Sequence, residues 1–195
     1  DQPNRHQPMK TTRFNRFATV LFCLAVAPVA VADTYYWDVN GATPGTGGTG
    51  TYGSTNTRWT TDPTGSLATV ALANGLNNDY LFEGTPGTIT FNGTFTGNSL
   101  TFNTNYTLTT GTGASSVRTL GLITGATGAF SLAAGVNLTV TSFADPAPLG
   151  INITAPISGT STSSVSITGG VFGTELATLS GLSTFGGGTT ISGGT

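Results

Sequence analysis

The chain has 195 residues, of which 37% are hydrophobic and only 7% charged, against roughly a quarter charged in an ordinary soluble domain. That length is enough for one domain with a continuous core. A formal net charge of −2 and a single cysteine exclude a strongly basic nucleic-acid-binding protein and a disulfide-stapled scaffold.

Residues 9–32 have the pattern of a secretory signal peptide. Three basic residues follow Met9, an apolar run extends from 17 to 31, and Ala30-Val31-Ala32 has the small-x-small pattern of a cleavage site. An apolar segment of about 15 residues between those two features is typical of secretion and short for a membrane span. We therefore predict a signal-peptide helix at 9–32, cleavage before Asp33, and an upstream extension at 1–8.

Cleavage before Asp33 leaves little side-chain chemistry in residues 33–195. They contain no His, Cys, Lys or Met, their cations are Arg58 and Arg118, and half of them are Gly, Thr or Ser. A Ser-His-Asp or Cys-His site cannot be built from these residues, and a zinc site would have carboxylates only. No calcium-loop pattern is present. We expect no catalytic residue, no cofactor and no metal site.

Short runs that alternate apolar and small polar residues recur every 8 to 14 residues after position 78, and Gly, Asn or Ser turns separate them. This pattern predicts strands and no helix. The expected strands are 79–82, 88–91, 99–102, 106–109, 119–124, 129–132, 137–141, 151–154, 165–168, 175–179 and 189–192.

Two all-β architectures fit this spacing, a sandwich and a parallel β-helix (solenoid) whose strands stack rung on rung. The short strands, the Gly and Asn turns and the abundance of Thr favour the solenoid, because identical side chains can stack along one face. We therefore predict the N-terminal portion of a β-helix, with a capping region at 33–78 and stacked rungs at 79–195.

Aromatic residues crowd the capping region, where Tyr35, Trp37, Tyr52 and Trp59 lie within 25 residues of one another. One interpretation is a platform on which sugars stack. The other is a cap that covers the apolar end of the first rung, which solenoids need in order to stay soluble. The four residues are therefore candidate contacts with a glycan or partner, and the cap is the favoured interpretation.

Residues 143–150 interrupt the strand rhythm with two prolines. Such a segment predicts a loop that projects from a corner of the solenoid, where binding function is often carried. Asp145 and Pro146 are candidate contact residues for this reason.

A polysaccharide-acting β-helix enzyme is the sharpest alternative, since such sites use clustered carboxylates. Asp79 and Glu83 are the closest acid pair after the first mature residues. Four residues along one strand separate them by roughly 13 Å, which exceeds the roughly 5–9.5 Å between the carboxyls of a glycosidase. A non-catalytic role is favoured, and a β-sandwich carbohydrate-binding module is a further alternative.

Residues 172–195 resemble the autotransporter-associated β-strand repeat, whose pattern is a G-x-L-x-L-S-G strand, an aromatic residue and G-G-T-T-[IV]-x-x-G-T. The matching residues are Gly173, Leu176, Leu179, Ser180, Gly181, Phe185, Gly187, Gly188, Thr189, Thr190, Ile191, Gly194 and Thr195. The segment 154–159 and the Tyr-Tyr-Trp-Asp sequence that ends at Asp38 also resemble segments of proteins that carry this repeat.

The resemblance implies a right-handed parallel β-helix passenger that is secreted and displayed at the bacterial cell surface or outer membrane. It further implies a C-terminal barrel, absent from these 195 residues, which suggests that the chain is an N-terminal fragment. We expect an adhesive or structural role, with surface glycans or neighbouring cells as partners and no nucleic acid.

Overall fold

The computed structural model describes residues 31–110, 118–141, 150–168, 176–179 and 181–192, all within one structural unit, Val31–Thr195. These residues form sixteen strands and no helix. The expected upstream extension and signal peptide lie outside the described residues, apart from positions 31 and 32.

The strands form three sheets. The first sheet contains, in spatial order, β13 (Ile157–Ser158), β10 (Phe130–Leu132), β7 (Ser99–Phe102), β4 (Asn78–Phe82), β1 (Asp33–Trp37) and β3 (Trp59–Thr60). The second contains β16 (Thr189–Ser192), β14 (Ser164–Thr168), β11 (Asn137–Thr141), β8 (Tyr106–Thr110), β5 (Gly87–Phe91) and β2 (Gly50–Tyr52). The third contains β15 (Leu176–Leu179), β12 (Gly150–Ile153), β9 (Arg118–Leu122) and β6 (Phe95–Gly97).

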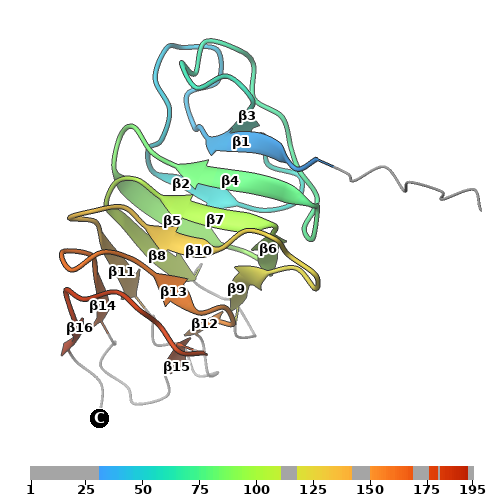
Figure 1. Cartoon of the computed structure of the whole chain (residues 1–195). Helices are drawn as coiled ribbons and strands as arrows, with labels where there is room; N and C mark the ends of the chain where they lie inside the picture. The colour runs from blue at the N-terminus through green and yellow to red at the C-terminus, as the bar shows by residue number, and fades with distance from the viewer. Residues whose placement is uncertain (1–30, 111–117, 142–149, 169–175, 180, 193–195) are drawn as a thin grey trace, which may run out of the picture. The chain divides into compact units, whose positions relative to one another are not determined.

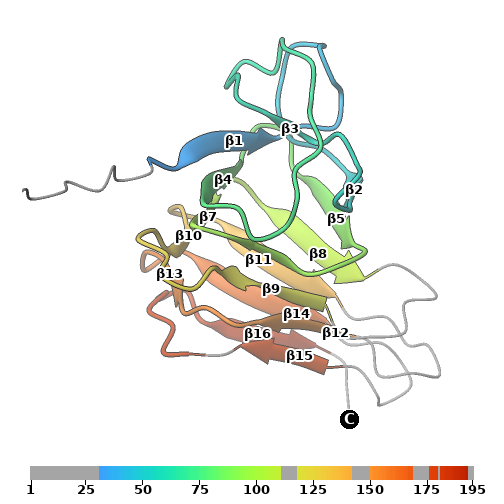
Figure 2. The same ribbon diagram turned by 90° about the vertical axis from the view of Figure 1, so that its right-hand side faces the viewer.

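From β4 to β15 the chain visits the three sheets in turn, so that each strand pairs with the strand three places further on. β4, β7, β10 and β13 are stacked in Figure 1, and β9, β12 and β15 in Figure 2. All pairings between these strands are parallel, and the antiparallel β1–β3 pair lies at the edge of the first sheet. The predicted all-β structure with parallel sheets is confirmed, and it is consistent with a β-helix-like fold. The sandwich alternative requires antiparallel sheets and does not fit.

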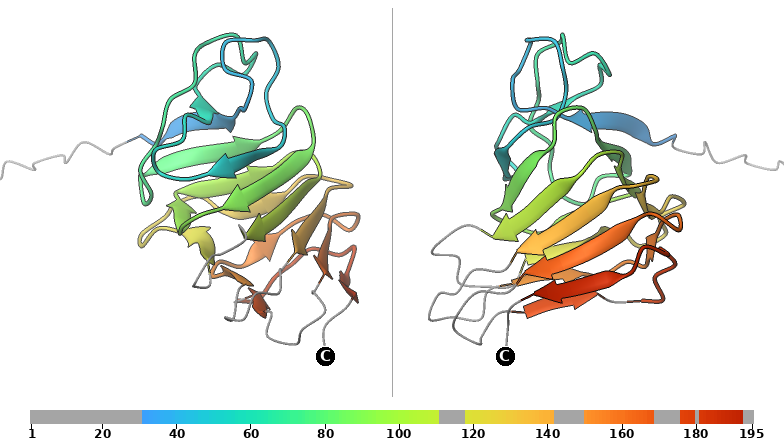
Figure 3. Two further views of the ribbon diagram at one scale, coloured as in Figure 1. Left: turned by 180° about the vertical axis from the view of Figure 1, so that it is seen from behind. Right: turned by 90° about the vertical axis from the view of Figure 1, so that its left-hand side faces the viewer.

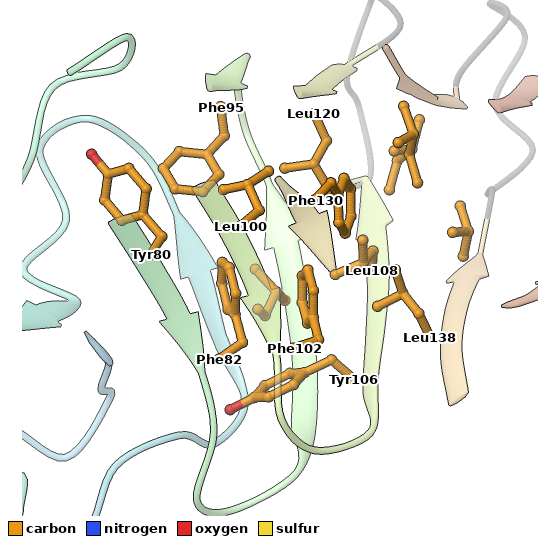
Figure 4. Close-up of a cluster of buried hydrophobic side chains, with 14 of the residues drawn as sticks. Tyr80, Phe82, Phe95, Leu100, Phe102, Tyr106, Leu108, Leu120, Phe130 and Leu138 are labelled. Carbon is orange, nitrogen blue, oxygen red and sulfur yellow. The ribbon is translucent and has the colours of Figure 1, made fainter. Parts of the chain in front are cut away.

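The core is built from in-register columns of apolar side chains, because alternate residues of a strand point to opposite faces. In the first sheet, Tyr80, Leu100, Phe130 and Ile157 occupy one column. In the second, Ile89, Leu108 and Val140 occupy another. All seven side chains are at most 1% exposed, and Figure 4 shows part of this cluster.

Rings dominate one part of the core and aliphatic side chains the other. Phe82 and Phe102 stack with ring centroids 4.3 Å apart, and ring contacts continue to Phe130. In later strands the buried residues are Ile, Leu, Val and Ala. Stacking suits parallel in-register strands, because identical rings on neighbouring strands lie directly above one another.

Candidate functional site

Three of the six candidate contact residues are core residues. The side chains of Trp37, Tyr52 and Trp59 are at most 2% exposed. The Trp59 ring lies 4.7 Å from that of Tyr80, and Trp37 Nε1 donates a hydrogen bond to the Gly48 carbonyl at 3.0 Å. A sugar cannot stack on these three rings in this structure, because other side chains cover their faces.

The other candidates have different positions. Tyr35 is half-buried on β1, and its ring stacks on that of Tyr80 with centroids 6.3 Å apart. It keeps one partly exposed side and stays a candidate contact. Asp145 and Pro146, with most of the proline-interrupted segment, lie outside the described residues.

Asp79 and Glu83, the acid pair considered for an enzyme, both accept hydrogen bonds from neutral side chains. Asp79, on β4, accepts hydrogen bonds from Asn98 Nδ2 at 2.8 Å and from Ser99 Oγ at 2.6 Å. Glu83, which follows β4, accepts one from Asn103 Nδ2 at 3.0 Å. Such bonds tie each carboxylate, at its own end of β4, to a residue at or next to an end of β7.

No group of three or more His, Cys, Asp or Glu side chains is placed to hold a metal ion among the residues that the structure describes. In the same part of the chain, no helix has the length and apolarity needed to cross a membrane.

A groove of about 410 Å³ lies on the outer face of the second sheet, near the beginnings of β5, β8 and β11. Figure 3 (right) shows these strands in the stack that runs from green to red. The groove is lined by Pro86, Gly87, Thr88, Asn105, Tyr106, Thr107, Asn137 and Thr139. None of these residues is charged. Apart from the tyrosine, five of them carry a hydroxyl or a carboxamide, which can both donate and accept hydrogen bonds.

Three threonines form a column along the groove. Thr88 pairs with Thr107, and Thr107 pairs with Thr139, across the parallel β5–β8 and β8–β11 ladders. Each threonine lies between buried or inward-facing residues along its strand and is itself half-buried. The column therefore repeats at the strand spacing of roughly 4.8 Å.

Two asparagines fix one end of the groove. The Asn137 backbone N–H donates to Asn105 Oδ1 at 2.8 Å, and Asn137 Nδ2 donates to Ser166 Oγ at 3.1 Å. Asn137 Oδ1 is buried without a hydrogen-bond partner. The asparagine side chains are thus held in place, and one acceptor among them is unsatisfied.

Tyr106 supports the groove from below, where its ring is 2% exposed. Its hydroxyl lies 3.1 Å from the Thr85 carbonyl and 3.3 Å from the Glu83 carbonyl. Burial raises the pKa of this phenol well above its usual range, so the hydroxyl stays protonated and donates. The bond ties β8 to the segment that leads into Pro86 and so fixes the wall of the groove.

Sequence alone did not identify this groove. Its signal is the repeated Thr-apolar-Thr triplet at 88–90, 107–109 and 139–141. The triplets show that threonines face outward on three strands, but only the observed register aligns the three strands side by side.

Comparison with known proteins gives one distant similarity. Over 124 residues, or 60% of its length, the chain is 33% identical to the adhesin BmaC autotransporter of Brucella suis. The aligned part is 4% of that protein's length. No family model matches the chain, and no solved structure gives a significant match. The chain is therefore similar, over a small part of a much larger protein, to an autotransporter adhesin.

Proposed function

We propose that the chain is a secreted, surface-displayed passenger segment of an autotransporter-like bacterial protein, with a structural and adhesive role and no catalytic one. The observation that carries the proposal is the three-sheet parallel stack in a chain that is similar to part of an autotransporter adhesin.

The proposed architecture is a right-handed parallel β-helix over residues 79–195. Its support is the order in which the chain visits the sheets, together with the strong preference of parallel crossovers for the right hand. Within it, 172–195 is proposed as an autotransporter-associated repeat. Its strands β15 and β16 join the third and second sheets.

Residues 33–78 are proposed as a cap on this stack. The antiparallel β3 lies at the edge of the first sheet beside β1, where parallel stacking stops. Trp59 on β3 contacts the rings of Phe82 and Phe95 at 5.6 and 5.4 Å. An antiparallel strand with a bulky ring covers both the hydrogen-bonding edge and the apolar end of a stack.

Secretion is proposed to depend on a signal peptide at 9–32, with 1–8 as an upstream extension. Its support is the order of basic, apolar and small residues before Asp33. Display on the outer surface of the bacterium would then bring the folded segment into contact with surface glycans or neighbouring cells.

The adhesive role is tested by comparing two strains of the source bacterium, one with the intact gene and one with an in-frame deletion of residues 33–195. We expect the deletion to lower adherence to host cells or to other bacteria while an antibody to another part of the protein still labels the intact cells. Unchanged adherence with the remaining protein still displayed would overturn the adhesive role.

A further inference from the structure

We propose that the groove on the outer face of β5, β8 and β11 binds a neutral polysaccharide. The inference rests on the proposed surface display, because it names the ligand class and the binding site of that display. The site differs from the aromatic residues and the proline-interrupted segment that the sequence suggested.

The three threonine hydroxyls of the groove are not used by the described part of the protein. Thr88, Thr107 and Thr139 make no side-chain hydrogen bond to any other residue of the described part of the chain. On the outer face of the first sheet, in contrast, Thr101 bonds Ser131 at 3.1 Å and Ser158 donates to the Phe130 carbonyl at 3.1 Å. These hydroxyls of the first sheet are satisfied within the protein, whereas the three threonine hydroxyls of the groove are not.

The lining selects an uncharged partner. No Lys, Arg, Asp or Glu lines the groove, so a charged ligand would lose hydration without meeting a counter-charge. A threonine hydroxyl donates one hydrogen bond and accepts others, as does each hydroxyl of a sugar. The unsatisfied Oδ1 of Asn137 adds one hydrogen-bond acceptor without a partner at this end of the groove.

The shape of the site favours a chain molecule. The three threonines belong to successive rungs, and Ser166 and Thr190 continue the column on β14 and β16. The ring of Pro86 and the threonine methyl groups add apolar patches, against which the C–H faces of sugar rings can pack. A polymer with hydroxyls at regular intervals can therefore follow the column across several rungs.

The test is direct binding of the purified protein to neutral hexasaccharides of glucose, xylose, mannose and N-acetylglucosamine, with heparin and polygalacturonate oligosaccharides as charged probes. Isothermal titration and glycan-array binding are both suitable readouts. We expect at least one neutral probe to bind and the charged probes to bind more weakly. Failure of every neutral probe, or preference for the charged probes, would overturn the inference.

The site is tested by the double variant Thr107→Val and Thr139→Val, which removes two hydroxyls and keeps the β-branched shape. We expect the affinity for the neutral probe to fall about tenfold, because two ligand hydrogen bonds are lost. The matched control is Thr101→Val on the outer face of the first sheet, which should leave the affinity unchanged. The double variant Thr107→Ser and Thr139→Ser keeps both hydroxyls and should restore binding.

Equal binding by the double valine variant and the parent protein would overturn the assignment of the site. The double valine and the double serine variant should both retain the β-sheet circular dichroism of the parent, because the hydroxyls of Thr107 and Thr139 have no partner within the described structure. The proposed function and this inference can fail separately. If the cells adhere but the protein binds no neutral glycan, the adhesive role stands and the groove proposal falls. If the protein binds a neutral glycan but is not displayed on the cell surface, the groove proposal stands and the proposed function falls.

Discussion

Among single residues, two buried tyrosines show how hydrogen bonding decides whether a buried hydroxyl adds to the stability of the fold or lowers it. Both Tyr52 and Tyr106 are 2% exposed. The Tyr52 hydroxyl is buried without a partner, and burial raises the pKa of this phenol to about 12. The Tyr106 hydroxyl contacts two backbone carbonyls.

We predict that Tyr52→Phe leaves the free energy of unfolding unchanged or raises it, because an unsatisfied buried hydroxyl costs stability. Tyr106→Phe should lower the free energy of unfolding by about 1–2 kcal/mol, because it removes the hydroxyl that donates to the Thr85 and Glu83 carbonyls. Urea unfolding of both variants measures the difference. A larger loss for Tyr52→Phe than for Tyr106→Phe would contradict this account of the two hydroxyls.

Asp38 is a second residue whose environment predicts a measurable effect. It is fully buried, its Oδ1 accepts the Asn40 N–H at 2.9 Å, and its Oδ2 has no partner. Burial raises the pKa of this carboxyl above its ordinary value of 3.8, and the nearby charge of Asp62 raises it further. The folded protein therefore favours the protonated carboxyl of Asp38 more strongly than the unfolded chain does.

A raised pKa of a folded acid gives stability that is fully present below 3.8 and is lost as the pH rises through the folded pKa. We predict that Asp38→Asn gains stability relative to the parent as the pH rises from below 3.8 through the folded pKa of Asp38, and that the difference then levels off. Urea unfolding at pH 3, 5 and 7 measures this trend.

Asp62→Asn is the control, because its effect on stability should change with pH in the opposite direction. Hydrogen bonds, above all from the Thr64 N–H, lower the pKa of Asp62, so its contribution is present above 3.8 and lost as the pH falls. The variant should be less stable than the parent at pH 7 and equal to it at low pH. If the stabilities of the two variants, relative to the parent, changed with pH in the same direction, the raised pKa of Asp38 and the lowered pKa of Asp62 would both be contradicted.

At the level of strands and turns, close approach between neighbouring backbone segments depends on glycine. Gly47 forms parallel β-bridges with Asp38 on one side and Thr85 on the other, and its φ is +92°. A Cβ there would lie 2.4 Å from the Thr85 carbonyl oxygen and 2.5 Å from that of Glu83. Gly41 also has a positive φ, of +69°, but a Cβ added to it would meet no atom within 4 Å.

We predict that Gly41→Ala costs about 1 kcal/mol, which is the strain of a left-handed alanine. Gly47→Ala should cost about 3 kcal/mol or more, because backbone overpacking adds to the same strain. Thermal or urea unfolding of the pair separates packing from strain. Equal losses would show that the rungs can move apart at Gly47 without cost.

The same scale shows how much of the fold follows from sequence. All eleven expected strands are present within two residues at each end, because each has a clear apolar alternation between turn residues. Strands β1, β2, β3, β6 and β13 were not expected. β6 is only Phe95–Gly97 and β13 only Ile157–Ser158, so neither is long enough to show an alternating pattern.

Sequence predicted the candidate site less well, for a physical reason. An aromatic residue is equally suited to a sugar platform and to a core, and only packing decides between them. Trp37, Tyr52 and Trp59 pack inward. The groove depends on the register between Thr88, Thr107 and Thr139. These residues are 19 and 32 positions apart along the chain, and strand register over such separations is not readable from one sequence.

At the scale of the whole unit, stability should vary along the stack. In repeat folds each rung is held mainly by its neighbours. Strands β4, β5, β7 and β8 pair on both sides and carry fully buried residues. All four residues of β16 are exposed, and Ile191 is 71% exposed.

We predict that, in a purified protein limited to residues 33–195, backbone amides of β16 exchange with deuterium more than about 100-fold faster than those of β4, β7 and β8, because in that protein β16 pairs with β14 on one side only and local opening starts at such an edge. Hydrogen-exchange mass spectrometry of the purified protein measures this. Uniform exchange across all strands would contradict rung-by-rung stability and indicate a single cooperative unit.

The proposed secretion and surface display of this chain can be tested in the source bacterium. An antibody raised against residues 33–195 would be applied to intact and to lysed cells, and the captured protein would be sequenced from its N-terminus. We expect labelling of intact cells and an N-terminus at Asp33. Labelling only after lysis, with residues 9–32 still attached, would contradict this proposal.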